Sequence, residues 1–77
     1  MQVSFTKRAM KDLRGIPKAD ALALMAKLGA YAKTGDGDVK KLQGRDGFRL
    51  RHGNYRALFQ VMGDVVVVRV AHRREVY

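Results

Sequence analysis

The hydrophobic pattern of this chain changes its period once, at the segment Thr34-Gly35-Asp36-Gly37-Asp38. Before that segment apolar residues recur at steps of three and four, which is typical of helices. After it apolar and polar residues alternate, which is typical of strands. A chain of 77 residues has material for one domain, so helices and strands must share one core. The pattern predicts a single α+β domain over residues 1–77.

The front half predicts a short strand followed by two helices. Val3 and Phe5 alternate with polar neighbours, and Thr6 is suited to cap a following helix. Gly15 is expected to end that helix, and residues 17–33 are rich in strong helix formers. The side chains expected in the core from these two helices are Met10, Ala21, Leu24, Met25, Leu28 and Ala32.

The back half predicts three strands joined by tight turns. A half-buried strand begins at Phe48 and ends before Gly53-Asn54, which is typical of a two-residue hairpin turn. Residues 55–62 form the next strand, with Met62 expected in the core, and Gly63-Asp64 forms the second turn. Residues 65–71 are apolar on both faces, which favours a central strand. The order β-α-α-β-β-β predicts a helical hairpin on one face of a mostly antiparallel sheet.

Several classes of site and location are not expected from the composition. The chain has no cysteine, which excludes a thiol nucleophile and a Cys-based zinc site. The two histidines have no acidic or histidine neighbour at metal-ligand spacing, so we expect neither metal nor cofactor. The N-terminus lacks an apolar signal region, and the longest apolar run, 21–26, is too short to span a bilayer. These features favour the cytoplasm and no membrane partner.

The charge of the chain predicts an anionic partner. Sixteen Lys and Arg stand against seven Asp and Glu, a formal net charge of +9. A small domain this basic is expected to meet a polyanion or an acidic protein. In residues 39–77, seven of nine basic residues are arginine, whose planar fork can hold phosphate oxygens.

Strand parity is expected to gather these arginines on the sheet face that the helices leave free. Arg49 and Arg51 share a face, Arg56 follows the first turn, and Arg69 and Arg73 share a face if the last strand continues that far. A solvated basic surface and a phosphate-binding site both remain open. The residues that approach the same strand are Lys40, Lys41 and Arg45.

Three other side chains have two interpretations each. His52 lies beside a predicted turn and is expected to be exposed. His72 is either a surface residue or a proton acceptor. Tyr77 is either a packing residue or a reactive phenol.

Several segments together resemble the RelE/ParE toxin superfamily of type II toxin–antitoxin systems. They are Lys40-Lys41-Leu42, Phe48-Arg49-Leu50-Arg51, Asn54-Tyr55-Arg56-Ala57-Leu58-Phe59-Gln60-Val61, Val65-Val66-Val67-Val68 and His72-Arg73-Arg74-Glu75-Val76-Tyr77. The resemblance covers essentially the whole chain and implies the same element order. RelE-type members cut mRNA in the ribosomal A site, whereas ParE-type members poison DNA gyrase without that chemistry.

The resemblance implies a set of site residues. The working groups of RelE-type members fall on Arg49, Arg51, Arg56, Arg73 and Tyr77. Lys40, Lys41, Arg45, His72 and Arg74 are expected to assist RNA binding. Some relatives have lysines at the first two positions. A guanidinium stays protonated and cannot act as a base, so that role would fall on Tyr77, His72 or a ribosomal group.

Three functions follow as hypotheses. The first is a metal-independent, ribosome-dependent mRNA endonuclease, the second a gyrase poison, and the third a basic binding module without toxicity. Both toxin hypotheses imply a RelB-like antitoxin with an acidic or amphipathic segment. They also imply a heterotetramer or higher complex that binds operator DNA.

Overall fold

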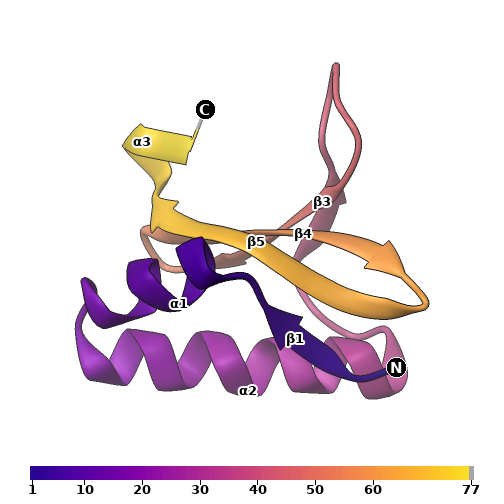
Figure 1. Ribbon diagram of the computed structural model, residues 1–77, viewed down its shortest axis with the longest axis horizontal. Coiled ribbons are helices and arrows are strands. Elements are labelled where there is room, and N and C mark those ends of the chain that lie inside the picture. Colours follow the sequence, from indigo (N-terminus) through magenta and orange to yellow (C-terminus); the bar gives the residue numbers. More distant parts are fainter. Residues whose placement is uncertain (77) are drawn as a thin grey trace.

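The computed structural model describes residues 1–76 and has two layers (Figure 1). One layer is a five-stranded sheet with the order β1-β5-β4-β3-β2, in which only the β1–β5 pair is parallel. The helices α1 and α2 cover one face of this sheet, and the short helix α3 lies on the other side. The elements are β1 (Val3–Phe5), α1 (Lys7–Arg14), α2 (Lys18–Thr34), β2 (Val39–Lys41), β3 (Phe48–His52), β4 (Tyr55–Met62), β5 (Asp64–His72) and α3 (Arg73–Val76).

The predicted α+β fold is confirmed, with two elements that were not expected. Strand β2 pairs antiparallel with β3 and forms the far edge of the sheet. Helix α3 begins where β5 ends, at Arg73. The expectation that Arg69 and Arg73 share a strand face is therefore wrong. The backbone leaves the sheet after His72, and the Arg73 N–H donates to the carbonyl oxygen of Asn54 at 2.7 Å.

The ends of the two long helices follow the capping residues in the sequence. The Thr6 hydroxyl oxygen accepts the Ala9 N–H at 3.2 Å, which satisfies one free donor of the first turn of α1. The same hydroxyl donates to the Val68 carbonyl at 3.1 Å and so attaches the start of the helix to β5. Helix α1 ends at Gly15, and α2 ends at Gly35 with φ of 79°, a left-handed value that suits glycine.

The main core lies between the helices and the sheet. Phe59 is fully buried, and its ring centroid lies 5.3 Å from that of Tyr31 on α2 and 5.6 Å from that of Phe48 on β3. Leu24 and Leu28 of α2 are fully buried against this cluster. Aromatic pairs at these separations add to the burial of apolar area.

The methionines expected in the core are exposed instead. The exposed fractions are 39% for Met10, 43% for Met25 and 69% for Met62. A helix lying on a sheet buries only a narrow stripe. Leu24, Leu28 and Ala32 form that stripe on α2, which leaves Met25 beside it. Met62 lies at the end of β4, next to the hairpin turn.

Asp12 attaches α1 to the edge of β5. Its Oδ2 accepts the backbone N–H of Val70 at 2.9 Å, and its Oδ1 accepts from Arg8 Nε at 3.2 Å. Strand β1 pairs only with Val65–Val67, so the Asp12 carboxylate takes the place of a neighbouring strand further along β5. This aspartate closes a sheet edge that backbone pairing leaves open.

We predict that Asp12→Ala lowers the free energy of unfolding by about 1–3 kcal/mol, because the Val70 N–H loses its acceptor. Urea denaturation followed by circular dichroism measures this loss. Asp36→Ala, which removes an exposed carboxylate from the loop after α2, serves as control and should change stability by less than about 0.5 kcal/mol. Equal effects of the two variants would contradict the role of Asp12.

Candidate nucleic-acid interface

Arg49, Arg51 and Arg56 lie on the sheet face that α1 and α2 leave uncovered. Arg69 of β5, which pairs in register with Leu58, shares this face but extends to Asp12 at the sheet edge. Arg51 pairs in register with Arg56, and Arg49 pairs with Leu58. Register partners share a face, and the alternating residues Leu50 and Ala57 belong to the core on the helical side. Lys40 of β2 pairs with Arg49 and extends the cluster. We call Lys40, Arg49, Arg51 and Arg56 the arginine face.

Two segments flank the arginine face. Helix α3 and the loop that joins β2 to β3 both rise on the side of the sheet remote from α1 and α2 (Figure 1). Arg73 and Arg74 of α3 are exposed, and Arg45 is exposed in the β2–β3 loop. The bond from Arg73 N–H to Asn54 places the start of α3 beside the β3–β4 turn, the end of the sheet that also carries Arg51 and Arg56.

One predicted residue, Lys41, points to the sheet face opposite the arginine face. Lys41 pairs with Phe48, whose ring contacts the core on the helical side, so strand parity directs Lys41 away from Arg49. Tyr77 lies outside the described residues.

Asp38 sits between two of the arginines. Its Oδ2 lies 2.6 Å from Arg51 Nε, and its Oδ1 lies 4.0 Å from Arg49 Nη1. The Asp38 carbonyl oxygen also accepts the Arg51 N–H at 3.0 Å. The loop before β2 therefore brings a carboxylate into the cationic cluster, a contact that the sequence analysis did not foresee.

Arg56 is occupied by the backbone of the adjacent turn. Arg56 is only 9% exposed, and its Nη1 donates to the carbonyl oxygens of Gly53 and Tyr55, both at 2.9 Å. A buried guanidinium needs such acceptors. Arg56 thus holds the β3–β4 turn while its positive charge contributes to the arginine face.

His52 is half-buried, not the exposed turn residue that was expected. Its Nδ1 lies 2.9 Å from Lys27 Nζ and its Nε2 lies 3.1 Å from Asp20 Oδ1. The ammonium can only donate, so Nδ1 is the acceptor and Nε2 carries the proton. Both partners belong to α2, so His52 attaches β3 to this helix on the side opposite the arginine face.

His72 is the last residue of β5 and immediately precedes α3. Its Nδ1 accepts the Arg74 N–H at 3.2 Å, and its ring meets Tyr55 edge-on with centroids 5.8 Å apart. In its neutral form the imidazole therefore carries its proton on Nε2. His72 caps α3 as well as lying near the predicted RNA-binding residues.

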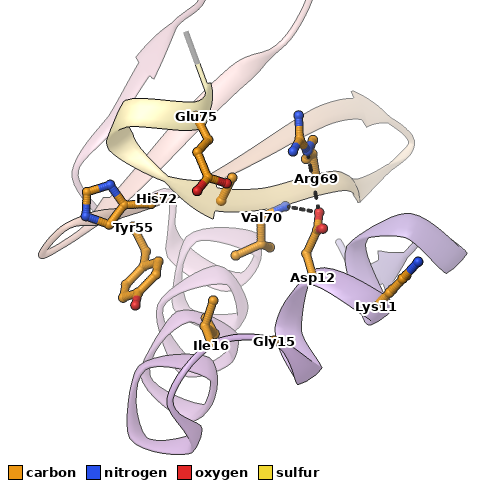
Figure 2. A pocket seen from close by; sticks show the side chains of 10 residues that line it. Lys11, Asp12, Gly15, Ile16, Tyr55, Arg69, Val70, His72 and Glu75 are labelled. Atoms are coloured by element: carbon orange, nitrogen blue, oxygen red, sulfur yellow. Dashed lines mark hydrogen bonds and ion pairs between the residues drawn. The ribbon is translucent and has the colours of Figure 1, made fainter.

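A separate cavity of about 430 Å³ lies between α1, β5 and α3. Figure 2 shows Tyr55, Ile16 and Val70 around it, with the Glu75 carboxylate directed towards it from α3. Arg69 extends to Asp12, with Nε and Oδ2 3.8 Å apart. Positive and negative side chains alternate around this cavity, so it lacks the single sign of charge that favours a polyanion. The arginine face is the stronger phosphate-binding candidate.

Residues 1–76 contain neither a cluster of metal ligands nor a helix able to span a membrane. No group of three or more histidine or acidic side chains in this range is arranged to hold a metal ion. None of the helices described there has the length and apolar character needed to cross a bilayer.

Comparison with known proteins identifies the family. A family model described as the ParE toxin of the type II toxin–antitoxin system parDE matches residues 3–77. The chain belongs to the RelE/ParE toxin family. Toxin RelE3 of Methanocaldococcus jannaschii is 32% identical over 84 residues, which cover 100% of this chain and 96% of the relative.

Two solved antitoxin–toxin complexes contain a similar fold. A chain of the RelB–RelE antitoxin–toxin complex from Methanococcus jannaschii superposes with a TM-score of 0.78 at 29% identity, covering 95% of this chain and 93% of the other. The complex RelBE2 from Mycobacterium tuberculosis gives a TM-score of 0.76 at 28% identity, covering 96% and 92%. These structures confirm that this toxin has a RelE-like fold.

We predict that Arg56→Ala lowers the free energy of unfolding of this toxin by about 1–3 kcal/mol, because the turn carbonyls of Gly53 and Tyr55 lose a charged donor. Arg51→Ala removes the same charge from an exposed ion pair and should cost less than about 1 kcal/mol. Thermal and urea denaturation of both variants measure the difference. An Arg56→Ala protein as stable as the wild type would show that its guanidinium does not hold the turn.

Proposed function

We propose that this toxin is a ribosome-dependent mRNA endonuclease that cleaves without a metal. The observation that supports this most is the arginine face, where β3 and β4 align Arg49, Arg51 and Arg56. Helix α3 adds the exposed Arg73 at the same end of the sheet. Four guanidinium groups near one surface suit a phosphate whose negative charge increases during reaction.

The reaction proposed is attack by the ribose 2′-oxygen on the adjacent phosphorus. A base removes the 2′-hydroxyl proton, the new P–O2′ bond forms, and the P–O5′ bond breaks. The 5′-oxygen takes up a proton, and the products are a 2′,3′-cyclic phosphate and a free 5′-hydroxyl. The phosphorane charge would be stabilised by the positive guanidinium groups of Arg49, Arg51, Arg56 and Arg73. These groups would not transfer protons, because a guanidinium stays protonated.

The proton transfers fall to other groups. Because His72 Nδ1 already accepts the Arg74 N–H, a neutral His72 has no free ring nitrogen to take up a proton and is poorly suited to act as base. Its Nε2–H would donate a hydrogen bond to an oxygen of the reacting phosphate, and the leaving 5′-oxygen would take its proton from water or a ribosomal group. The base is then Tyr77 or a group of the ribosome. Tyr77 can also stack on a base of the message.

The flanking cations would hold the message along the arginine face. Lys40 and Arg45 lie on the β2–β3 hairpin, and Arg74 lies on α3. Lys41 would contribute from the edge of the sheet. Contacts of this kind with phosphates make the binding constant fall as salt rises. The slope of log K against log[salt] is about −0.7 per phosphate neutralised on a single strand.

We propose a RelB-like antitoxin as the protein partner, because the solved relatives are RelB–RelE complexes. Exposed apolar side chains on the helices, Met10, Leu22 and Met25, suit the apolar side of an amphipathic segment. Acidic residues of the same segment would pair with the +9 chain. The proposed toxin–antitoxin complex is a heterotetramer or larger assembly that binds operator DNA in the cytoplasm.

A second candidate function is poisoning of DNA gyrase. It is favoured by the matching family model, which describes ParE toxins. The Asp38 carboxylate also compensates part of the charge of Arg49 and Arg51. Such compensation would weaken an RNA-cleaving site but would not matter to a toxin that acts on gyrase without cutting RNA.

We predict that the purified toxin cuts mRNA on translating ribosomes and that Arg73→Ala slows cleavage by about 10²–10³-fold, because a cation near the developing charge is removed. Primer extension on the translated message measures both the cut and its rate. Tyr77→Phe tests the phenol in the same assay.

Lys33→Ala is the matched control, since it removes one exposed charge at the end of α2 on the helical side and should leave the rate unchanged. Intact message with folded wild-type toxin and active ribosomes would contradict the endonuclease proposal. Gyrase–DNA cleavage complexes accumulating under those conditions would support the second candidate.

A further inference from the structure

The Asp38 carboxylate is held in place against the arginine face by its backbone. The carbonyl oxygen of Asp38 accepts the Arg51 N–H at 3.0 Å, at the point where β2 begins beside β3. Its side chain then reaches Arg51 Nε at 2.6 Å. This backbone bond fixes the Asp38 main chain beside Arg51 whether or not the side-chain contact is made.

The contact with Arg49 is incomplete. Asp38 Oδ1 lies 4.0 Å from Arg49 Nη1, which is too long for a hydrogen bond. Among the described residues, Arg49 Nη1 is buried and has no hydrogen-bond acceptor. A buried donor without an acceptor is unfavourable, so this position favours an additional oxygen ligand. A phosphate carries more oxygens than a carboxylate and can reach both arginines at once.

The ion pair can be opened from solvent. The Arg51 side chain is 55% exposed and that of Asp38 is 41% exposed. Exposed ion pairs contribute little to stability and are weakened by salt. An arriving phosphate can therefore replace the carboxylate on Arg51 without disturbing the core.

We propose that Asp38 is an internal competitor of phosphate. In the free toxin it occupies the Arg49–Arg51 pair, and a nucleic-acid phosphate binds there only after displacing it. The carboxylate thus lowers the affinity of the arginine face for polyanions that are not positioned well enough to replace it. This inference rests on the part of the proposed function that assigns phosphate binding to these arginines, but it does not require cleavage.

The test uses a fluorescein-labelled, 12-nucleotide single-stranded DNA, which lacks the 2′-hydroxyl and cannot be cut by the proposed reaction. Fluorescence anisotropy with the full chain at several KCl concentrations gives affinity and salt dependence. We expect Asp38→Asn to bind about fivefold more tightly than the wild type. The gain should shrink as the KCl concentration rises, because salt weakens the Asp38–Arg51 ion pair that opposes binding in the wild type.

The matched control is Asp36→Asn, which changes the net charge equally two residues away. No ion pair is formed by Asp36 within residues 1–76, and we expect less than a twofold change. Asp38→Glu keeps the charge and should bind like the wild type. In an Arg51→Ala background, Asp38→Asn should lose most of its effect, because the cation that it uncovers is absent.

Three results would overturn the proposal. They are equal affinities for Asp38→Asn and Asp36→Asn, weaker binding by Asp38→Asn, and an unchanged gain in the Arg51→Ala background. If Asp38→Asn is unstable in urea denaturation, Asp38→Ser replaces it under the same criteria. If Asp38→Asn binds more tightly but the wild type does not cleave mRNA, the competitor role stands and the endonuclease proposal fails. If the wild type cleaves mRNA but Asp38→Asn gains no affinity, the endonuclease proposal stands and the competitor role fails.

Discussion

Two helices can cover only one face of a five-stranded sheet, and this constraint decides how the rest of the chain is used. The core under α1 and α2 contains Phe59, Leu24 and Leu28. On the other face, Leu58 and Ala71 are buried with the help of Leu42 and Val68, without a long helix above them. The remaining area of that face is available to charged side chains, and it carries Arg49, Arg51 and Arg56.

Three aspartates attach the outer elements to this sheet. Asp12 binds α1 to the edge of β5, and Asp20 binds α2 to His52 on β3. Asp38 binds the loop between α2 and β2 to Arg51. A chain with sixteen basic and seven acidic residues repels itself unless the acids are placed where cations or free N–H groups converge. The first two contacts stabilise the fold, whereas the third also reaches the candidate site.

Most of the fold could be predicted from local patterns. Capping by Thr6, termination at Gly15 and the turn at Gly53-Asn54 depend on backbone chemistry within a few residues, so the sequence reveals them directly. Strand β2 was missed because three residues with two lysines carry little strand pattern. Recognising it would have required pairing Val39–Lys41 with Phe48–Leu50, which would also have placed Asp38 beside Arg51.

The candidate site likewise has a part that the local sequence pattern predicts and a part that depends on the tertiary structure. Alternation along β3 and β4 was sufficient to predict that Arg49, Arg51 and Arg56 share a face, because a strand has a period of two residues. The position of Arg73 on α3, the burial of Arg56 under its own turn and the pairing of His52 with α2 all depend on residues distant in sequence.

The sequence by itself therefore determined the two long helices, four of the five strands, the family and the face on which the arginines gather. Only the tertiary structure decided which of those arginines meet a carboxylate, because Asp38 and Arg51 are brought together by the pairing of two strands.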